Sequence, residues 1–480
     1  MRTDVKKPLP PAHGSGAEEK QGTAAHGSGA ERRTGADQNV VVADERSSGG
    51  RHSELLERHR AVMPTWLSLF YEQPIEIVSG SGRHVTDGEG RTYLDFFAGI
   101  LTNMLGYDVP EVRDAIKEQA DRGVLHTSTL YLLRQQVDLA EKIAALSGIE
   151  GAKVFFTNSG TEANETALML TTAYRRSNQV IALRNSYHGR AFATVGVTGN
   201  RGWGVSSLSP VQVTYAQSGY RYRSSFAGLD DGAYVDACVH DLRELIDTTT
   251  AGDVACLIAE PVQGVGGFAV PPDGLLGAYA EVLAEYGILF VSDEVQTGWG
   301  RTGESFWGIG SSGVVPDAMT FAKGLGNGAA IGGVVARPEL MDCLQGQSVS
   351  TFGGNPLSTA AANATLDYVL HHDLQTRAAT IGRVLLEGLR AQIGDLPIVG
   401  EVRGKGLMIG VELVHAGSTD PDPAAAARAL ETCRERGLLV GKGGLYGNCL
   451  RIAPPLTLTE GEAAEGLAVL VDALASVDAG

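Results

Sequence analysis

Residues 287–298 read Gly-Ile-Leu-Phe-Val-Ser-Asp-Glu-Val-Gln-Thr-Gly, and residues 317–324 read Asp-Ala-Met-Thr-Phe-Ala-Lys-Gly. Each stretch holds an apolar run of the length of a buried strand. The first run ends at Asp293, and the second ends at Lys323. Ligands of open α/β sheets bind at the carboxyl ends of the strands. The sequence therefore predicts that an acid and an amine face one ligand site at a sheet edge.

This combination of an acid and an amine suits pyridoxal 5′-phosphate (PLP). A lysine forms a Schiff base with that cofactor, and an aspartate or arginine partners its pyridine nitrogen. Either residue alone is a weak signal, because a strand-end aspartate is commonly a turn residue and a lysine is commonly a surface charge. The hypothesis therefore depends on the other motifs in the chain.

Strand-like apolar runs alternate with helical patterns between about residues 111 and 345. The strands are expected near residues 153–158, 178–184, 254–260, 287–293, 317–322 and 329–336. Continuous apolar strands that alternate with helices are typical of a mostly parallel sheet with helices on both faces. We therefore expect an α/β fold whose large, PLP-binding domain spans 111–352.

The chain ends are expected to form a smaller α+β domain and a tail. Residues 1–50 are rich in Gly, Ser, Ala and charge and contain Ala-His-Gly-Ser-Gly-Ala-Glu twice, so we predict a disordered tail. Residues 51–110, with a hairpin turn at Asp87-Gly-Glu-Gly, are expected to pack with the small domain. Residues 353–480 are expected to form that domain. Its helices are predicted at 424–436 and 460–475, and its strands at 407–414 and 450–453.

Composition narrows the class of protein. The 480 residues are 43% hydrophobic and 20% charged, which is ordinary for a globular chain of two domains. A net charge of −17 argues against a nucleic-acid partner. The five cysteines form no C-x-x-C pair, which fits a reducing compartment and predicts no metal site. No apolar run approaches the ~18 residues of a membrane span, and no secretory signal is evident, so a cytoplasmic protein without membrane contact is expected.

Other strand ends also carry polar residues. Residues 158–161 (Asn-Ser-Gly-Thr) lead into a helix, whose free backbone N–H groups could bind a phosphate, although an ordinary N-cap has the same pattern. Residues 187–190 (Tyr-His-Gly-Arg) offer a ring to stack on a flat cofactor and a guanidinium for a carboxylate. Glu260 ends another strand. These ends supply the parts of a site around an anionic, aromatic ligand.

One motif indicates a different cofactor. Residues 298–303 (Gly-Trp-Gly-Arg-Thr-Gly) fit the G-x-G-x-x-G pattern of dinucleotide sites. That interpretation requires a helix directly afterwards and an acidic residue on a second strand about 20 residues later. Residues 304–313 are too rich in Gly and Ser for such a helix. A nicotinamide site is therefore rejected.

Over about residues 60–475 the chain resembles the class III PLP-dependent aminotransferases, which have fold type I. The motifs that carry the resemblance are Asn158-Ser-Gly-Thr-Glu-Ala, Tyr187-His-Gly-Arg, Glu260-Pro-Val-Gln-Gly, Asp293-Glu-Val-Gln-Thr-Gly-Trp-Gly-Arg-Thr-Gly, Ala322-Lys-Gly and Thr351-Phe-Gly-Gly-Asn-Pro. Three further stretches look most like the alanine–glyoxylate (3-aminoisobutyrate–pyruvate) branch: His126-Thr-Ser-Thr-Leu-Tyr, Gly404-Lys-Gly-Leu-Met-Ile-Gly and Gly441-Lys-Gly-Gly-Leu-Tyr-Gly-Asn. The resemblance implies a transaminase with a ping-pong mechanism.

The resemblance also implies roles for single residues. Lys323 would form the Schiff base and shuttle the proton, and Asp293 would pair with the pyridinium nitrogen. Gly160 and Thr161 would contact the phosphate, Tyr187 the ring, and Gln296 the phenolic oxygen. Ser159, His188 and Glu260 would support these contacts. Thr351 would reach the phosphate of the neighbouring subunit, so a homodimer with shared active sites is implied.

Two arginines bear on the substrate. Arg451 matches the family's arginine for the α-carboxylate, and Arg190 matches the one that ornithine-, acetylornithine- and 4-aminobutyrate-type members direct at a distal carboxylate. Those members carry a glutamate that pairs with the C-terminal arginine, and Val265 stands at its position here. We hypothesise that Arg451 therefore favours a small 2-oxo acid acceptor such as pyruvate or glyoxylate. Arg190 is not typical of the alanine–glyoxylate branch, which suggests an ω-amino or diamino acid donor.

Several alternatives stay open at the level of sequence. An acetylornithine-, ornithine- or 4-aminobutyrate-type transaminase would use 2-oxoglutarate as acceptor. A class III aminomutase, racemase or decarboxylase would keep the site and change the reaction. A non-enzymatic binding protein on this fold is disfavoured, because a degenerate site would be free to lose Lys323, Asp293 and Gln296.

Overall fold

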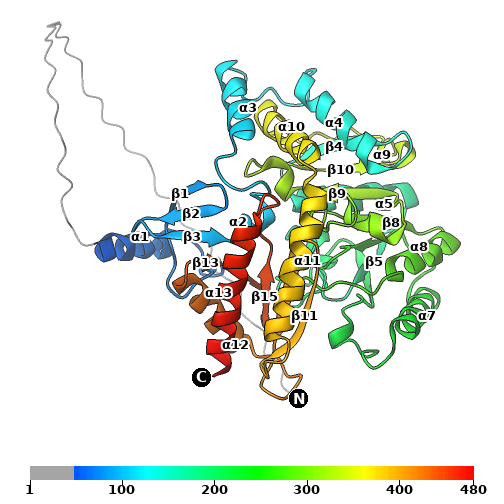
Figure 1. Ribbon diagram of the computed structural model, residues 1–480. Helices are drawn as coiled ribbons and strands as arrows, with labels where there is room; N and C mark the ends of the chain where they lie inside the picture. The colour runs from blue at the N-terminus through cyan, green and yellow to red at the C-terminus, as the bar shows by residue number, and fades with distance from the viewer. Residues whose placement is uncertain (1–47, 480) are drawn as a thin grey trace, which may run out of the picture. The chain divides into compact units, whose positions relative to one another are not determined.

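The computed structural model describes residues 48–479 (Figure 1). Residues 1–47 of the predicted tail lie outside the described part of the chain. Residues 48–50, the end of that predicted tail, instead form the first turn of helix α1 (Ser48–Val62). From Ser48 onward the chain forms one compact unit, and the domain boundaries at 110 and 352 stay predictions.

A seven-stranded sheet positions the site. In spatial order its strands are β4 (Lys153–Thr157), β10 (Gly332–Ala336), β9 (Ala318–Phe321), β8 (Leu289–Asp293), β7 (Cys256–Ala259), β5 (Gln179–Leu183) and β6 (Gln212–Ala216). Strand β10 is antiparallel to both of its neighbours, and the other neighbouring strands are parallel. The predicted α/β fold with a mostly parallel sheet is confirmed.

Strand β6 is missing from the sequence prediction. Its residues, Gln-Val-Thr-Tyr-Ala, lie at the edge of the sheet, and the first of them is exposed. Because an edge strand is only partly buried, it lacks the continuous apolar run that marks the inner strands.

Helices cover both faces of this sheet, and the side chains of each strand alternate between them. Val180 and Ala182 of β5 pack in one apolar cluster with Leu168 of helix α5 (Gly160–Arg175). Ile181 and Leu183 belong to a second, larger cluster on the opposite face. The helices that contribute to the larger cluster include α4 (Arg134–Ser147), α7 (Asp231–Thr249), α8 (Leu275–Tyr286) and α10 (Pro356–His371). This two-sided burial explains why the inner strands are apolar throughout.

The chain ends build two smaller sheets. The first contains β1 (Ile77–Ser81), β2 (His84–Asp87), β3 (Thr92–Asp95) and β13 (Leu438–Leu439). The second is antiparallel and contains β11 (Val399–Lys405), β12 (Met408–Leu413), β15 (Cys449–Ile452) and β14 (Gly441–Gly443). Strand β13 pairs with β3, so the segment before residue 110 is joined to the C-terminal part.

The remaining helices complete the fold. Helices α11 (Leu374–Ile393), α12 (Pro423–Glu435) and α13 (Glu460–Asp478) pack beside the second small sheet (Figure 1). The shorter or more peripheral helices are α2 (Ala98–Leu101), α3 (Pro110–Asp121), α6 (Phe192–Gly196) and α9 (Pro338–Met341), with 3₁₀ turns at η1 (Arg221–Arg223), η2 (Gly308–Ser312) and η3 (Lys323–Gly326). Helix α3 begins at Pro110, and the Gly90 amide closes the predicted hairpin turn on the carbonyl of Asp87 at 3.0 Å.

The glycine-rich motif at 298–303 is structural. Turns and the 3₁₀ segment η2 follow it, so the α-helix that a dinucleotide site requires is absent from this described stretch. Arg301 is buried and donates to the carbonyls of Leu407 and Pro454, at 3.3 and 2.9 Å. The motif thus ties the edge of the large sheet to the second small sheet.

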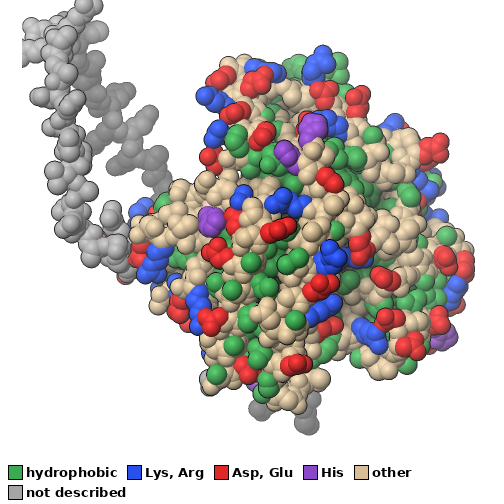
Figure 2. All heavy atoms as spheres, in the orientation of Figure 1, with side chains coloured by type: hydrophobic (Ala, Val, Ile, Leu, Met, Phe, Trp, Pro, Cys, Tyr) green, Lys and Arg blue, Asp and Glu red, His purple; other side chains and the backbone are tan. Residues whose placement is uncertain are grey.

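The surface of the described residues mixes side chains of both charges (Figure 2). Within residues 48–479, every helix is too short or too polar to cross a membrane. The face seen in Figure 2 carries acidic and basic side chains close together, without a continuous basic surface of the kind that binds a phosphate backbone.

Candidate active site

The carboxyl edge of the large sheet gathers the predicted residues. Strands β4, β5, β7, β8 and β9 all end there, and each end contributes to one cavity. Every residue predicted to contact the cofactor lines this cavity except Thr351. Three lining residues were not anticipated, namely Asn164, Gly189 and Val295. Residues up to 164 positions apart, from Ser159 to Lys323, meet because parallel strands end at the same edge.

Asp293 is buried and held by three donors. Its Oδ2 accepts from the Asn164 amide at 2.7 Å and lies 2.7 Å from Nδ1 of His188, and its Oδ1 accepts from the backbone N–H of Val295 at 3.1 Å. The side chain is 3% exposed. These contacts fix the carboxylate in orientation and keep it beneath the cavity. A fixed anion of this kind can partner a cationic ring nitrogen.

Asn164 is the most informative of the unanticipated residues. Its amide N–H groups donate to Asp293 and to the carbonyl of His188, and its Oδ1 accepts from the hydroxyl of Thr320 at 2.6 Å. Its one sequence signal is its position four residues after Gly160, which puts both on the same face of α5.

Lys323 begins the 3₁₀ turn η3, directly after strand β9 and Ala322. Its φ of +46° is in the left-handed region, which a residue with a Cβ adopts only when its surroundings hold it there. Burial lowers the pKa of its amine to about 8, against the opposing attraction of Asp293. Near neutral pH, a useful fraction of this lysine is therefore a neutral nucleophile.

We expect the lowered pKa to show in the pH dependence of cofactor uptake. Because only the neutral amine attacks an aldehyde, the rate at which the apoprotein combines with PLP should rise between pH 6 and 8 and level off above about 8. Stopped-flow absorbance measures this rate, with Nα-acetyl-lysine as the matched control. The control should keep accelerating toward its own pKa of about 10.4. A protein profile that rises in parallel with the control beyond pH 9.5 would show that Lys323 is not perturbed.

The N-terminus of α5 forms the phosphate end of the cavity. The Ser159 side chain caps the helix by accepting from the Glu162 amide, so the ordinary N-cap interpretation of this motif is also correct. Gly160 and Thr161 follow as the first helical residues, whose N–H groups have no partner within a helix. Gly189 approaches closely, since a Cβ there would lie 2.8 Å from Oγ1 of Thr161. The space and the donors suit a phosphate group.

Glu260 joins two of the strand ends. Its two carboxylate oxygens accept from the backbone N–H groups of Tyr187 at 2.9 Å and Gly264 at 2.8 Å. Burial raises the pKa of its carboxyl group to about 7. It therefore acts as a tie between the loops after β5 and β7, which places the Tyr187 ring at the cavity wall.

Gln296 lines the cavity, and Arg451 contacts it without lining the cavity itself. Nη2 of Arg451 donates to Oε1 of Gln296 at 2.8 Å, which leaves the Gln296 amide nitrogen free to donate elsewhere. Arg451 is packed between two rings, with its Cζ 5.1 Å from the Phe97 centroid and 4.6 Å from the Phe268 centroid. Burial lowers the pKa of its guanidinium to about 10. A cation this deep is expected to bind an anion that enters the site.

Arg190 and Thr351 lie outside the cavity. Arg190 is exposed, and its guanidinium sits 5.2 Å from the ring centroid of Trp66, which is also exposed. Thr351 is exposed too, next to Ser350, whose hydroxyl accepts from Asn158 at 3.3 Å. Both therefore stand near the cavity rather than in it.

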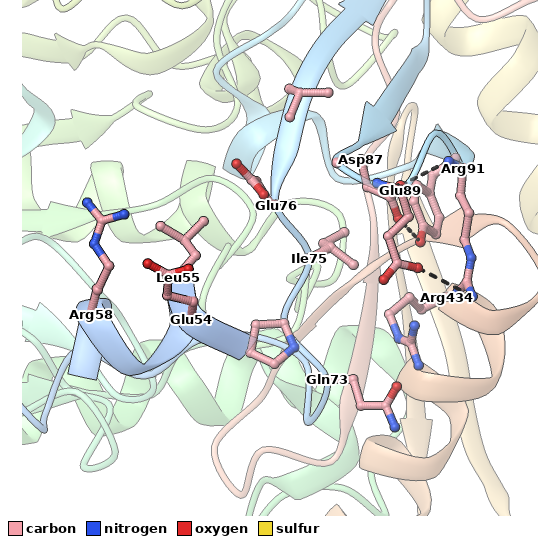
Figure 3. A pocket seen from close by; sticks show the side chains of 14 residues that line it. Glu54, Leu55, Arg58, Gln73, Ile75, Glu76, Asp87, Glu89, Arg91 and Arg434 are labelled. Carbon is pink, nitrogen blue, oxygen red and sulfur yellow. Dashed lines mark hydrogen bonds and ion pairs between the residues drawn. The ribbon is translucent and has the colours of Figure 1, made fainter. Parts of the chain in front are cut away.

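A larger cavity of about 560 Å³ lies elsewhere (Figure 3). It is bordered by α1, by the β2–β3 hairpin and by Arg434 of α12. Two of its carboxylates already have partners: Asp87 accepts from the backbone of Glu89 and Arg91 and from the hydroxyl of Tyr93, and Glu89 pairs with Arg91. None of the predicted site residues lines it. Size alone is therefore a poor guide to the chemistry of this molecule.

Comparison with known proteins identifies the family. The model of class III aminotransferases matches residues 70–474. The chain belongs to the class III aminotransferases. It is 40% identical over 411 residues to alanine–glyoxylate aminotransferase 2 homolog 2 of Arabidopsis thaliana, a match that covers 85% of this chain and 84% of the relative.

Other relatives are similar over almost the same span. An acetylornithine aminotransferase of Methanothermobacter thermautotrophicus is 36% identical, over 85% of this chain and 95% of its own. The solved structure of an (S)-enantioselective ω-transaminase from Thermomicrobium roseum has a TM-score of 0.81 at 33% identity, over 88% of this chain and 98% of that one. This aminotransferase accordingly uses PLP, as its sequence predicted.

The residues present fit that cofactor. The cavity offers an amine of lowered pKa at Lys323, a fixed anion at Asp293 and an N–H-rich helix terminus at Gly160, which match an aldehyde, a ring nitrogen and a phosphate. When bound, PLP acts as an electron sink that stabilises negative charge on the substrate carbon. The aminotransferase's own residues then have separate tasks. Lys323 would accept and return a proton, Asp293 would hold the ring nitrogen protonated, and Arg451 would orient the carboxylate of the substrate.

Proposed function

We propose that this aminotransferase moves an amino group from an ω-amino or diamino acid to a small 2-oxo acid such as pyruvate or glyoxylate, in two ping-pong half-reactions. The observation that supports the acceptor is the state of Arg451. Among the described residues it has no carboxylate within ion-pair distance, and its buried Nε atom has no hydrogen-bond partner. A buried cation without a counter-ion is costly, so a substrate carboxylate is stabilised there in both half-reactions.

Val265 leaves the guanidinium free. It is buried, and its carbonyl accepts from the Gly444 amide at 2.8 Å. A Cβ on Gly443 would lie 2.5 Å from Cδ of Arg451 and 2.8 Å from the carbonyl oxygen of Val265, so the two residues border the same glycine. A carboxylate at position 265 would therefore be within reach of Arg451.

We expect Val265→Glu to weaken binding of the acceptor. The new carboxylate would pair with Arg451 and compete with the carboxylate of pyruvate, which should raise KM for pyruvate by roughly tenfold or more. Steady-state kinetics with pyruvate and 2-oxoglutarate measure the effect. Val265→Gln, of nearly equal size and without charge, is the matched control. If the glutamate variant keeps the acceptor preference and the KM of the parent protein, this account of the acceptor is wrong.

Arg190 supports the proposal for the donor. It stands beside Tyr187 near the cavity, and its positive charge acts on that phenol, whose pKa is nonetheless raised by burial. A cation outside the cavity can meet the far carboxylate of a long amino acid. The same observation favours a second candidate, an acetylornithine-type enzyme that uses 2-oxoglutarate. A higher kcat/KM with 2-oxoglutarate than with pyruvate would support the second candidate.

The donor is tested by absorbance titration of the yellow PLP-bound protein. We expect ω-amino or diamino acids to bleach the colour faster than ordinary α-amino acids, and the added 2-oxo acid to restore it in stoichiometric amount. Bleaching by α-amino acids alone would contradict the donor part of the proposal. A protein that never becomes yellow with PLP would contradict the role of Lys323.

A homodimer with shared sites is part of the proposal. Thr351 is exposed next to the cavity, as expected of a residue that serves a neighbouring subunit. Large apolar side chains are exposed close to it in sequence or in space: Leu130, Tyr131, Leu132 and Phe352, the last stacked on His126 at 4.3 Å. An exposed apolar surface of this kind is typical of an interface. Sedimentation equilibrium that gives the mass of a single chain would contradict this assembly.

The cytoplasm is the proposed compartment. All five cysteines are free, and four of them are buried. Unpaired cysteines are usual in a reducing environment. Fractionation of the cells that make this protein tests the assignment.

A further inference from the structure

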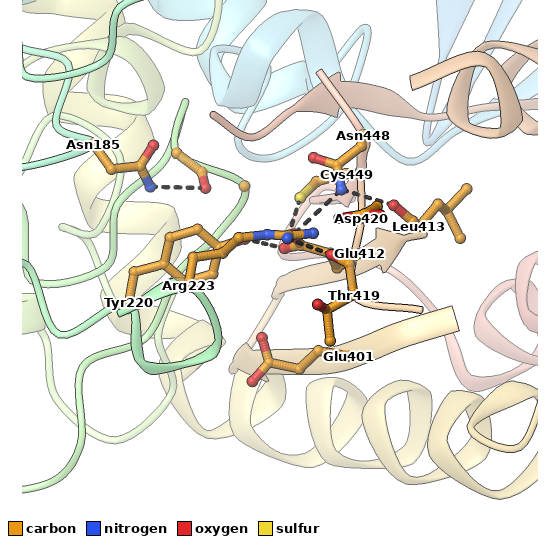
Figure 4. Close-up of polar contacts among 12 residues, drawn as sticks. Asn185, Tyr220, Arg223, Glu401, Glu412, Leu413, Thr419, Asp420, Asn448 and Cys449 are labelled. Atoms are coloured by element: carbon orange, nitrogen blue, oxygen red, sulfur yellow. Dashed lines mark hydrogen bonds and ion pairs between the residues drawn. The ribbon is translucent and has the colours of Figure 1, made fainter. Parts of the chain in front are cut away.

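A buried ionic cluster lies between the second small sheet and the segment that follows β6. At its centre is Glu412 of β12, which is fully buried. Its carboxylate lies 2.8 Å from Nη1 of Arg403 and 2.7 Å from Nε of Arg223, and it also accepts from Asn448 and from the hydroxyl of Tyr220. Figure 4 shows Tyr220, Arg223, Asn448 and Cys449 gathered around Glu412. Both oxygens of this carboxylate have hydrogen-bond donors, so the cluster is rigid.

Arg403 connects this cluster to the large sheet. Its Nη1 contacts Glu412 and Glu401, while Nε and Nη2 both donate to the carbonyl of Gly267, at 3.1 and 2.8 Å. The guanidinium also sits over the ring of Tyr220, 4.7 Å from its centroid. Gly267 belongs to the loop after β7, the strand that ends at the active site. The planar guanidinium of Arg403 thus joins the second small sheet to an active-site loop.

That loop is strained where Arg403 holds it. Gly267 has a φ of +94°, and Phe268 has a φ of +51° although it carries a large side chain. Such a backbone persists only when its surroundings over-determine it. A Cβ at Gly267 would lie 2.9 Å from Nη2 of Arg403, so the close approach requires glycine. The two hydrogen bonds from Arg403 help to stabilise this conformation, together with the Gly267 and Phe268 amides, which both donate to the carbonyl of Gly264.

The strained loop places a ring against the substrate arginine. Phe268 is fully buried, and its ring centroid is 4.6 Å from Cζ of Arg451. The register of the small sheet reinforces this contact, because Arg403 and Arg451 pair with the same residue, Gly410, from opposite sides. A Cβ on Gly410 would lie 2.3 Å from the carbonyl oxygen of Gly267. Because Gly410 has no side chain, the loop that contains Gly267 can lie between the two arginines.

We infer that Arg403 is a positioning residue for the carboxylate site. By holding the Gly267 carbonyl it keeps the Phe268 ring packed on Arg451, and so fixes the guanidinium in the orientation that receives the substrate carboxylate. This inference rests on the proposed role of Arg451 in substrate binding. Arg403 touches neither substrate nor cofactor in this arrangement, so its effect falls on carboxylate affinity rather than on proton transfer.

The test is Arg403→Lys, measured on the PLP-bound protein. Lysine keeps a positive charge near Glu412 but lacks the planar fork that reaches Gly267. We expect the Kd for propanoate, measured by calorimetry, and the KM for pyruvate to rise by roughly 3- to 30-fold, the range of a lost cation–ring contact. Arg223→Lys is the matched control, because Arg223 contacts the same carboxylate of Glu412 without touching Gly267. It should change both constants by less than about twofold, in line with a change away from the site.

The outcomes separate this inference from the proposed function. Arg451→Lys should weaken the binding of propanoate more than Arg403→Lys does. If Arg451→Lys weakens propanoate binding and Arg403→Lys does not, the positioning role is wrong while the proposed function stands. Equal effects of Arg403→Lys and Arg223→Lys would also overturn the positioning role. If Arg451→Lys leaves the Kd unchanged, the carboxylate site itself is wrong.

A second variant covers the case in which Arg403→Lys does not fold. Phe268→Leu retains Arg403 and the ionic cluster but removes the ring that packs on Arg451. We expect the same rise in Kd for propanoate. A Phe268→Leu protein that binds propanoate as tightly as the parent would overturn the inference.

Discussion

Replacement of Lys323 by alanine should reduce the rate of transamination by roughly a thousandfold or more, the scale expected when a group that moves protons is lost. Lys323 is the only amine among the described residues that line the cavity. No neighbouring side chain can therefore form a Schiff base in its place. Single-turnover absorbance with the best amino donor measures the loss.

The alanine variant should retain its fold. Lys323 already has a φ of +46°, and alanine meets the same steric cost there because both residues carry a Cβ. Lys323→Arg is an informative companion, since arginine stays cationic at all working pH values and cannot supply a neutral amine. Lys153→Ala, at an exposed lysine paired with Asp342, is the control that should keep full activity. A near-native rate in Lys323→Ala would refute the assignment of this residue.

Replacement of Asp293 by asparagine should slow turnover by roughly 100- to 1000-fold, as removal of one fixed electrostatic contact commonly does. Asparagine has nearly the same shape, so its carbonyl can still accept from Asn164 or from the Val295 amide. The negative charge is lost, however, and the ring nitrogen then has no anion to keep it protonated. The expected result is a fall in kcat at saturating donor and acceptor.

The control for Asp293→Asn is a carboxylate in the same sheet that is remote from the cavity. Asp317 precedes strand β9 and accepts from the Phe290 amide at 2.8 Å, and it also pairs with Arg337. Asp317→Asn removes a charge from the sheet without altering the site, so it should lower thermal stability and leave kcat within about twofold. An Asp293→Asn enzyme as fast as Asp317→Asn would show that the carboxylate does not partner the cofactor.

Much of the site could be predicted from the sequence, because strand ends are visible in it. An apolar run of strand length that stops at a polar residue marks that residue for the carboxyl edge of a parallel sheet. Asp293, Lys323 and Glu260 follow this rule, and the structure brings them to one cavity. The glycine-rich motif at 298–303 could be rejected for the same kind of local reason, the missing helix after it.

The contacts that orient these residues could not be predicted in this way. Asn164 reaches Asp293 across 129 positions, and its partner Thr320 lies on a different strand. Its local pattern is that of any polar residue in a helix. Strand β6 was also missed, because partial burial at a sheet edge weakens the apolar run on which strand prediction depends.

The sequence by itself determined six of the seven strands of the large sheet, the identity of the lysine and the aspartate, and the family resemblance. These depend on periodicity and on residues close together in the chain. Only the tertiary structure decided how Arg451 is held. Arg403 reaches Gly267 across 136 positions, and both arginines pair with Gly410 through the register of three strands. Register is set by the burial of whole sheet faces and is not written in any single segment.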